Sequence, residues 1–87
     1  MARYNLRIKR SAAREIETIS CKQDRQRIVG RIQALAEQPR PVGCEKLAGY
    51  EDRYRIRQGS YRVVYSVDGR SRVGEVVSVG HRREVYR

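Results

Sequence analysis

Residues 54–65, which spell YRIRQGSYRVVY, constrain the fold of this chain more than any other segment. Two alternating runs rich in aromatic, β-branched and arginine residues flank Gly59 and Ser60. A glycine at the first of two central positions is typical of the two-residue turn of a β-hairpin. Because such a turn fixes the register of its strands, Arg57 is expected directly opposite Arg62. The segment therefore predicts an antiparallel hairpin with a defined pairing.

The same register gathers positive charge on one face of the hairpin. Arg55 lies two residues before Arg57 on the same strand, so both point to the side that Arg62 also occupies. Like charges opposite each other across a sheet are destabilising. Folding alone gives no reason for this arrangement, whereas a polyanion bound to that face would.

The charge of the whole chain agrees with an anionic partner. It has 20 Lys and Arg against 10 Asp and Glu, a net charge of +10. Residues 1–52 carry 11 basic and 7 acidic groups, or +4, whereas residues 53–87 carry 9 basic and 3 acidic groups, or +6. All nine basic groups of the second part are arginines, whose planar fork suits phosphate oxygens and stacked bases. Nucleic acid is the leading partner class; a merely solubilising surface, or one that docks an acidic protein, is the alternative.

Other classes of function find little support in the sequence. No apolar run approaches the roughly 20 residues of a membrane-spanning helix, and no signal peptide is visible. Cys21 and Cys44 form no CxxC pair and have no cluster of histidines beside them. We therefore expect reduced thiols, no structural metal, no membrane partner and a cytoplasmic location.

The first half of the chain predicts one strand and two helices. Residues 3–9 alternate apolar and polar side chains, as a half-buried strand does. Apolar residues then recur at helical spacing over 12–20, with Ser11 as the expected N-cap, and over 25–38, with Asp24 as the second expected N-cap. Two short helices joined by a tight turn make a helical hairpin.

The second half predicts a meander of strands. Proline and glycine at 39–43 end the second helix and lead into a loop through Gly49. The hairpin of 54–67 is followed by a turn and a valine-rich strand at 73–80. The expected order is strand, helix, helix, strand, strand, strand, which favours one α+β domain over 1–87 with both helices on one face of a single sheet. The hairpin side chains expected to pack on the helices are Tyr54, Ile56, Tyr61, Val63, Tyr65 and Val67.

Over nearly its whole length the chain resembles the RelE/ParE superfamily, the toxin halves of bacterial and archaeal toxin–antitoxin pairs. The most specific segments are YRIRQGSYRVVYSVD and the ending VSVGHRREVYR, with the KLAG segment before the hairpin as a weaker match. The YRVVY strand and the ending are similar to RelE-type ribosome-dependent messenger RNA endonucleases. The resemblance implies a RelE-like fold and cleavage of messenger RNA in the ribosomal A site. It also implies attack by the ribose 2′-hydroxyl, a cyclic phosphate product, and no metal or cofactor.

The resemblance also implies roles for individual residues. Arg57 and Arg62 match positions that hold phosphate oxygens, and Arg82 matches one that stabilises or protonates the leaving group. Arg55 stands where RelE-type proteins often have a lysine, and an arginine is a poor neutral base. The identity of the general base therefore stays open. The candidate catalytic residues are Arg55, Arg57, Arg62, His81, Arg82 and Tyr86.

The end of the chain carries several further expectations. His81 has a side chain that ordinarily exchanges protons near neutrality, so it is either a participant in acid–base catalysis or an exposed histidine of a basic tail. Tyr86 either stacks on a base or covers the edge of the core. We expect general attraction to RNA and the ribosome from Arg53, Arg83 and Arg87. The chain ends one residue after Tyr86, so we also expect it to lack a C-terminal helix found in some relatives.

Two other functions compete with the endonuclease. A ParE-like protein would inhibit DNA gyrase by binding it, and a non-catalytic module would use the basic face only to bind RNA or the ribosome. The retention of Arg57, Arg62, Arg82 and Tyr86 argues against the ParE branch. For any toxin of this superfamily the expected partner is a cognate acidic antitoxin that folds around the domain in a hetero-oligomeric complex.

Overall fold

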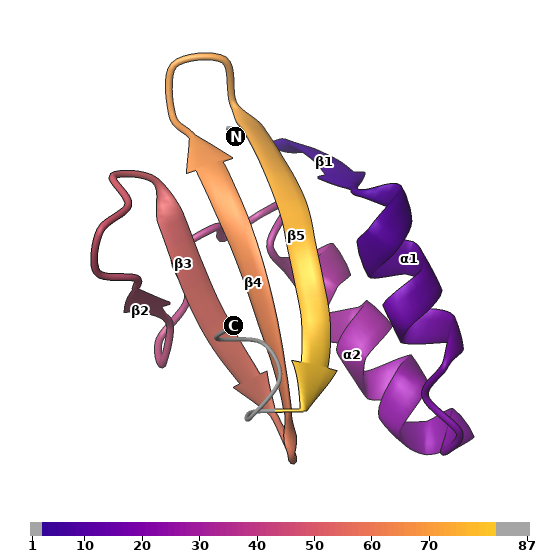
Figure 1. The fold of residues 1–87 in the computed structure, drawn as a ribbon. Helices are drawn as coiled ribbons and strands as arrows, with labels where there is room; N and C mark the ends of the chain where they lie inside the picture. Colours follow the sequence, from indigo (N-terminus) through magenta and orange to yellow (C-terminus); the bar gives the residue numbers. More distant parts are fainter. Residues whose placement is uncertain (1–2, 82–87) are drawn as a thin grey trace.

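The computed structural model describes residues 3–81 (Figure 1). It shows a mixed sheet with two helices packed on one face. Its elements are β1 (Asn5–Ile8), α1 (Arg10–Glu17), α2 (Lys22–Ala34), β2 (Glu45–Lys46), β3 (Arg53–Gln58), β4 (Tyr61–Asp68) and β5 (Val73–His81). The five strands lie in the order β1-β5-β4-β3-β2. Neighbouring strands are antiparallel except for β1, which runs parallel to β5. The predicted α+β class, with helices on one face of one sheet, is confirmed.

The core lies between the helices and the sheet. Both helices lie on the same side of the sheet in Figure 1, and no helix among residues 3–81 covers the opposite face, here called the open face. Tyr65 is 1% exposed, and Tyr54 and Tyr61 pack against the core from its margins. The hairpin side chains predicted to pack on the helices do so, whereas burial along β4 does not alternate, because Arg62 and Val64 on the other face are buried too. The buried core residues of the helical layer are Ala12, Ile16, Ile19, Ile28, Ile32 and Leu35, and those of the sheet are Ile56, Val63, Tyr65, Val67, Val76 and Val79.

The hairpin turn has the predicted geometry. Gly59 has a φ of +60°, and Ser60 does not have a positive φ. This is expected for a turn with glycine at its first central position. Arg57 pairs with Arg62 in the ladder of β3 and β4. The predicted register is confirmed.

The helix starts differ from the predicted ones. The N-cap of α1 is Lys9 rather than Ser11, because the Lys9 N–H still bonds the Val76 carbonyl of β5 at 3.0 Å and the helix begins at the next residue. The N-cap of α2 is Cys21, and Asp24 lies in the first turn. A carboxylate there interacts favourably with the positive end of the helix dipole but does not cap the helix. Both predicted caps were wrong by two or three residues.

The end of α2 and the first strand also differ from expectation. The helix ends at Ala34, and the N–H groups of the next two residues bond carbonyls three positions back in a tighter turn. Tyr4 donates its N–H to the Ala36 carbonyl at 2.7 Å and so ties this turn to the start of β1. Ile8 is 44% exposed because β1 is an edge strand. The predicted strand therefore buries less of its apolar side chains than its alternating sequence suggested.

A two-residue strand, β2, lies where the sequence predicted only loop. Glu45 pairs with Arg55, and Lys46 with Tyr54, along the outer edge of β3. Two residues are too few to show an alternating pattern, so the sequence carried no signal for this strand.

Two tyrosines of the hairpin hold the loop that leads into β2. The Tyr65 hydroxyl donates to the Pro39 carbonyl at 2.8 Å, and the Arg40 Nε donates to the Tyr54 hydroxyl at 3.0 Å. The two tyrosine rings stack with their centroids 5.9 Å apart. These contacts fix the path of the chain into β2 and thereby place its side chains on the open face.

Candidate functional site on the open face of the sheet

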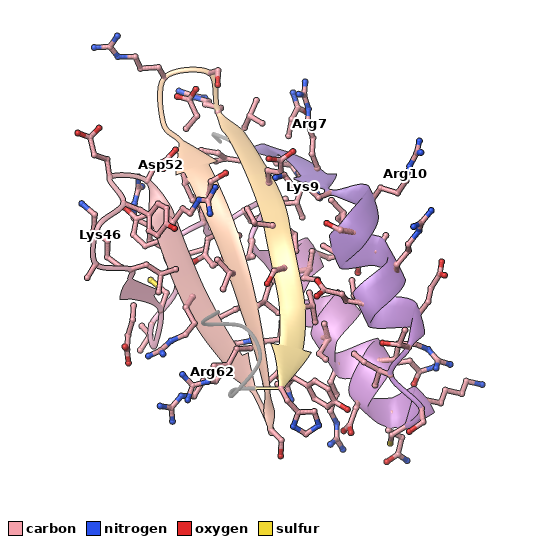
Figure 2. The ribbon with its side chains drawn as sticks, in the orientation of Figure 1. Arg7, Lys9, Arg10, Lys46, Asp52 and Arg62 are labelled. Carbon is pink, nitrogen blue, oxygen red and sulfur yellow. The ribbon has the colours of Figure 1, made fainter. Side chains whose placement is uncertain are left out.

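Two arginines face each other beside the hairpin turn. Arg57 of β3 is exposed, and Arg62 of β4, directly opposite, is 6% exposed. Cβ atoms of directly opposite residues lie about 4.5–5.5 Å apart, so the two side chains share one patch of surface. Arg62 lies at the turn end of the sheet in Figure 2. A buried arginine beside an exposed one suits an anion that arrives from solvent and meets a preorganised guanidinium.

Arg55 joins the same face but has a carboxylate partner. Its guanidinium forms an ion pair with Glu45 Oε2, and the side chains are 11% and 62% exposed respectively. The register explains the contact, because Glu45 lies directly opposite Arg55 on β2. The sequence reasoning missed Glu45, since the strand that carries it was not predicted. The carboxylate balances part of the charge that the arginines bring together.

Arg53 lies at the far end of β3. Strand alternation places it on the arginine face, opposite Ser66 of β4. Its guanidinium lies over the ring of Tyr50, 4.6 Å from the centroid. A cation on an aromatic face is held by the ring quadrupole. Its role in RNA or ribosome binding stays a prediction.

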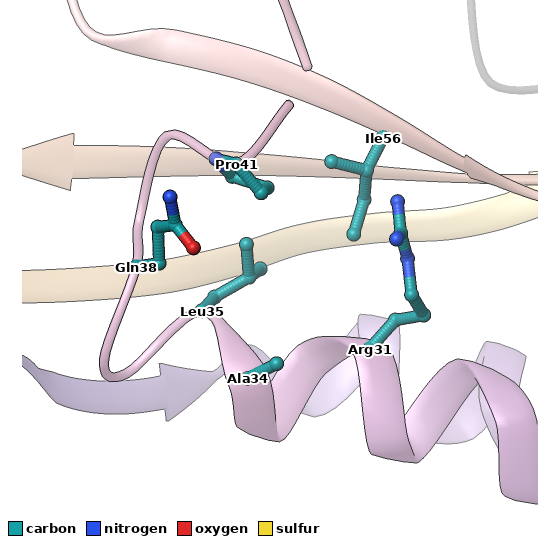
Figure 3. Close-up of a pocket in the computed structure, with 6 residues that line it drawn as sticks. All are labelled: Arg31, Ala34, Leu35, Gln38, Pro41 and Ile56. Atoms are coloured by element: carbon teal, nitrogen blue, oxygen red, sulfur yellow. The ribbon is translucent and has the colours of Figure 1, made fainter. Parts of the chain in front are cut away.

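Arg31 of α2 is a second residue that sequence reasoning missed. Its side chain rises toward β3 beside Ile56 in Figure 3. Its Nη2 donates to the Arg57 carbonyl at 3.4 Å, and its buried Nε has no partner within the part of the chain that the structure describes. The sequence did not indicate a role for Arg31, because a single arginine among the many polar residues of this helix forms no pattern. The small pocket of about 60 Å³ beside it is lined by Arg31, Ala34, Leu35, Gln38, Pro41 and Ile56.

His81 lies on the opposite face from the arginines. It pairs with Tyr61 in the β4–β5 ladder, and the two rings have centroids 4.7 Å apart. Gly80, not His81, lies opposite Arg62. His81 instead lines a cleft of about 280 Å³ on the helix side, which the end of α1 also lines. The structure thus places His81 on the face opposite to the arginines, and its role in acid–base catalysis stays a prediction.

A β-bulge explains the position of His81. Val64 pairs with Ser78 but Tyr65 pairs with Val76, so one extra residue of β5 lies between them. An extra residue inverts the alternation of everything that follows it. Without the bulge His81 would share the face of Arg62.

The remaining predicted site residues lie outside the described residues. These are Arg82, Arg83, Tyr86 and Arg87. Their roles stay predictions.

Residues 3–81 contain two cysteines and no clustered metal ligands. Within that range no group of three or more His, Cys, Asp or Glu is placed to hold a metal ion. Cys21 is exposed and Cys44 is half-buried, and both are free thiols. No helix in the same range is long and apolar enough to cross a bilayer.

Asp68 and Tyr65 have displaced pKa values for structural reasons. Hydrogen bonds from Ser71, together with the Arg70 N–H, lower the pKa of the exposed Asp68 carboxyl at the β4–β5 turn. Burial, with a smaller contribution from Cys44, raises the pKa of the Tyr65 hydroxyl. Neither group lies among the arginines of the open face, so these shifts belong to the scaffold.

Comparisons with known proteins agree with this fold. The sequence family described as the ParE toxin of type II toxin-antitoxin systems, parDE, matches residues 6–86. No match was found among curated proteins. The isolated RelE toxin of E. coli is 32% identical with a TM-score of 0.77, over 95% of this chain and 90% of that one.

Two solved complexes are also similar. In the intact E. coli RelBE toxin–antitoxin complex, the matching chain is 31% identical with a TM-score of 0.77, over 90% of this chain and 95% of that one. In the archaeal RelE–RelB complex from Pyrococcus horikoshii OT3, the matching chain is 27% identical with a TM-score of 0.82, over 97% and 99%. The family match spans nearly the whole sequence, and the fold agrees with it. The chain therefore belongs to the RelE/ParE superfamily, as a toxin of a type II toxin–antitoxin system.

Proposed function

We propose that this toxin is a ribosome-dependent endoribonuclease that cuts messenger RNA in the A site and so inhibits translation. The observation that supports this most strongly is the pair Arg57 and Arg62, placed opposite each other on the open face. The similarity to the isolated E. coli RelE toxin, at 32% identity, agrees with it. Like charges opposite each other do not by themselves stabilise a sheet, whereas two guanidiniums side by side stabilise the negative charge of a phosphodiester transition state.

In the proposed reaction the two arginines bind the scissile phosphate. The ribose 2′-hydroxyl attacks the neighbouring phosphorus, and negative charge grows on the non-bridging oxygens. Arg62 is nearly buried and holds a fixed direction, while Arg57 is exposed and reaches the incoming strand. Donors that are oriented before the reaction begins stabilise such charge without reorganisation, which typically contributes about 10²–10³ in rate for each donor. The ribosome supplies the alignment of the messenger, because free RNA is not held in the attacking geometry.

A cognate antitoxin is the proposed protein partner. The E. coli relative is solved as a complex with its antitoxin, RelBE. The net charge of +10 and the arginine face favour an acidic segment that folds over this surface, in a hetero-oligomeric complex. Messenger RNA on the ribosome as substrate implies action in the cytoplasm.

Inhibition of DNA gyrase is the second candidate function. The matching family is described as the ParE toxin of parDE systems, which is the specific observation in its favour. A gyrase inhibitor would act by binding a protein and would need no phosphate-binding arginine pair.

Mapping of messenger 5′ ends after induction in cells distinguishes the two candidates. The wild-type protein should create new 5′ ends within translated reading frames, and Arg62→Ala should abolish them. Arg10→Ala is the matched control, because Arg10 is exposed on α1, away from Arg62 in Figure 2. Arg62→Lys, which keeps the charge but not the fork, and a thermal unfolding curve separate loss of chemistry from loss of folding. Inhibition of gyrase supercoiling by the purified protein, without new 5′ ends, would overturn the proposal.

A further inference from the structure

Attack by a 2′-hydroxyl needs a group that accepts its proton, and the described arginines are unsuited to this task. An arginine stays protonated at any physiological pH. His81, the ordinary choice, lies on the other face of the sheet beside Tyr61. The proton acceptor must therefore come from another residue.

We propose that Glu45 is the general base of this site, held in position by Arg55. The inference rests on the proposed function, since it names the base of that same reaction. Its foundation is the ion pair between Glu45 Oε2 and the Arg55 guanidinium, beside the facing arginines Arg57 and Arg62.

The sheet register brings Glu45 to the correct face. It lies directly opposite Arg55, so its side chain points to the same side as Arg55, Arg57 and Arg62. Diagonal neighbours on adjacent strands have Cα atoms about 7–8 Å apart, which sets the span from Glu45 to Arg57. A ribose whose 3′-phosphate lies between Arg57 and Arg62 fits in that span, with its 2′-hydroxyl toward β2.

The exposure of Glu45 suits a catalytic carboxylate better than a structural one. Its side chain is 62% exposed and meets Arg55 through Oε2, so Oε1 is the oxygen that a donor from solvent or substrate would meet. Ion pairs with one strongly exposed partner typically add little to the stability of a fold. Stability is thus a weak reason for this pair, whereas fixing the direction of a carboxylate is a strong one.

The loop before β2 gives Glu45 a fixed position. A strand of two residues has little rigidity of its own, but the contacts of Tyr65 with Pro39 and of Arg40 with Tyr54 hold the chain that leads into it. A catalytic group requires support of this kind from its neighbours.

The other carboxylates near the sheet are poorly placed. Asp68 and Glu75 line a separate cleft at the opposite end of the open face. Glu15 accepts the Val79 N–H at 3.0 Å on the helix side. Among residues 3–81, Glu45 is the carboxylate that lies directly opposite Arg55, the neighbour of Arg57 on the same face.

The proposed step balances without any added reactant. Glu45 Oε1 takes the proton of the 2′-hydroxyl as the 2′-oxygen bonds to phosphorus. The bond from phosphorus to the 5′-oxygen breaks, and that oxygen takes a proton from solvent. The products are a 2′,3′-cyclic phosphate and a 5′-hydroxyl, and Glu45 returns its proton to solvent. Arg57 and Arg62 stabilise the non-bridging oxygens throughout.

Single-turnover cleavage on programmed ribosomes tests the role of Glu45. Glu45→Gln keeps the shape and cannot take the proton, so the cleavage rate should fall about 10²-fold or more. Its affinity for the ribosome should stay equal or increase, because a negative charge has been removed from a site that binds a polyanion. Glu45→Asp keeps the base but withdraws it by one methylene, so its rate should lie between the two. Glu37→Gln, which makes the same charge change at an exposed position after α2, should behave as the wild type.

The outcomes separate this inference from the function on which it rests. A Glu45→Gln protein that cleaves at the wild-type rate would overturn the assignment of the base and leave the proposed function intact. Parallel loss of affinity and cleavage in both Glu45 variants would show a structural role and overturn it as well. A wild-type protein that cuts no messenger would overturn the proposed function and this inference with it.

Discussion

Arg57 and Arg62 lie directly opposite each other across β3 and β4, next to the turn at Gly59. Like charges directly opposite each other across a sheet are destabilising, whereas the proposed reaction uses both to bind a phosphate. Stability and function should therefore make opposite demands on these positions.

Replacing one of the two arginines should stabilise the fold while it removes activity. Arg57→Thr puts a β-branched residue on an exposed strand position and removes one of two like charges, so the free energy of unfolding should rise by about 0.2–1 kcal/mol. Cleavage on the ribosome should fall at least about 10²-fold. Urea unfolding at low salt measures the first effect. A destabilised Arg57→Thr protein would contradict the account of this pair.

The turn glycine should be required for the register that makes the site. Gly59 has a φ of +60°, which costs an L-residue roughly 1–2 kcal/mol. Gly59→Ala should lower the free energy of unfolding by about that amount. Gly69→Ala is the control, because Gly69 lacks a positive φ and a Cβ there would meet only the Tyr4 hydroxyl at 3.8 Å. Equal unfolding curves for the two variants would refute the role given to the turn.

Tyr65 should contribute to stability in a pH-dependent way. Burial raises the pKa of its hydroxyl, so the folded protein favours the neutral form that donates to the Pro39 carbonyl. This contribution is fully present below the ordinary tyrosine pKa of about 10 and is lost as the pH rises above it. Tyr65→Phe should lose about 1 kcal/mol at neutral pH and show a shallower decline above pH 10. Parallel declines in the wild type and the variant, measured by urea unfolding, would count against this assignment.

His81 should be dispensable for cleavage. Its ring lies beside Tyr61 on the helix side, away from the arginine pair. His81→Ala should therefore cut messenger RNA on the ribosome at close to the wild-type rate. If His81→Ala still folds but loses as much cleavage as Arg62→Ala, then His81 takes part in the reaction and this prediction is wrong.

The sequence predicted those features that depend on local geometry. A two-residue turn with glycine at its first position determines the pairing of Arg57 with Arg62, and the alternation along β4 determines that Tyr65 is buried. These relationships need only neighbouring residues, and both were confirmed.

The features that depend on distant parts of the chain were missed. Glu45 reaches Arg55 only because a two-residue strand pairs with β3, and nothing in so short a segment indicates pairing. His81 changes face because of a bulge between β4 and β5, and the valine-rich sequence does not mark where the extra residue lies. Arg31 reaches the Arg57 carbonyl from a helix in another layer. Each depends on tertiary packing rather than on periodicity.

The most direct test of the central claim is cleavage of a defined messenger on purified ribosomes by the wild-type protein, with Arg62→Ala and Arg10→Ala compared. The account predicts a cut within the A-site codon that leaves a 2′,3′-cyclic phosphate and a 5′-hydroxyl, at wild-type rate for Arg10→Ala and at least about 10²-fold more slowly for Arg62→Ala. An intact messenger with the wild-type protein, or undiminished cleavage by a folded Arg62→Ala protein, would contradict it.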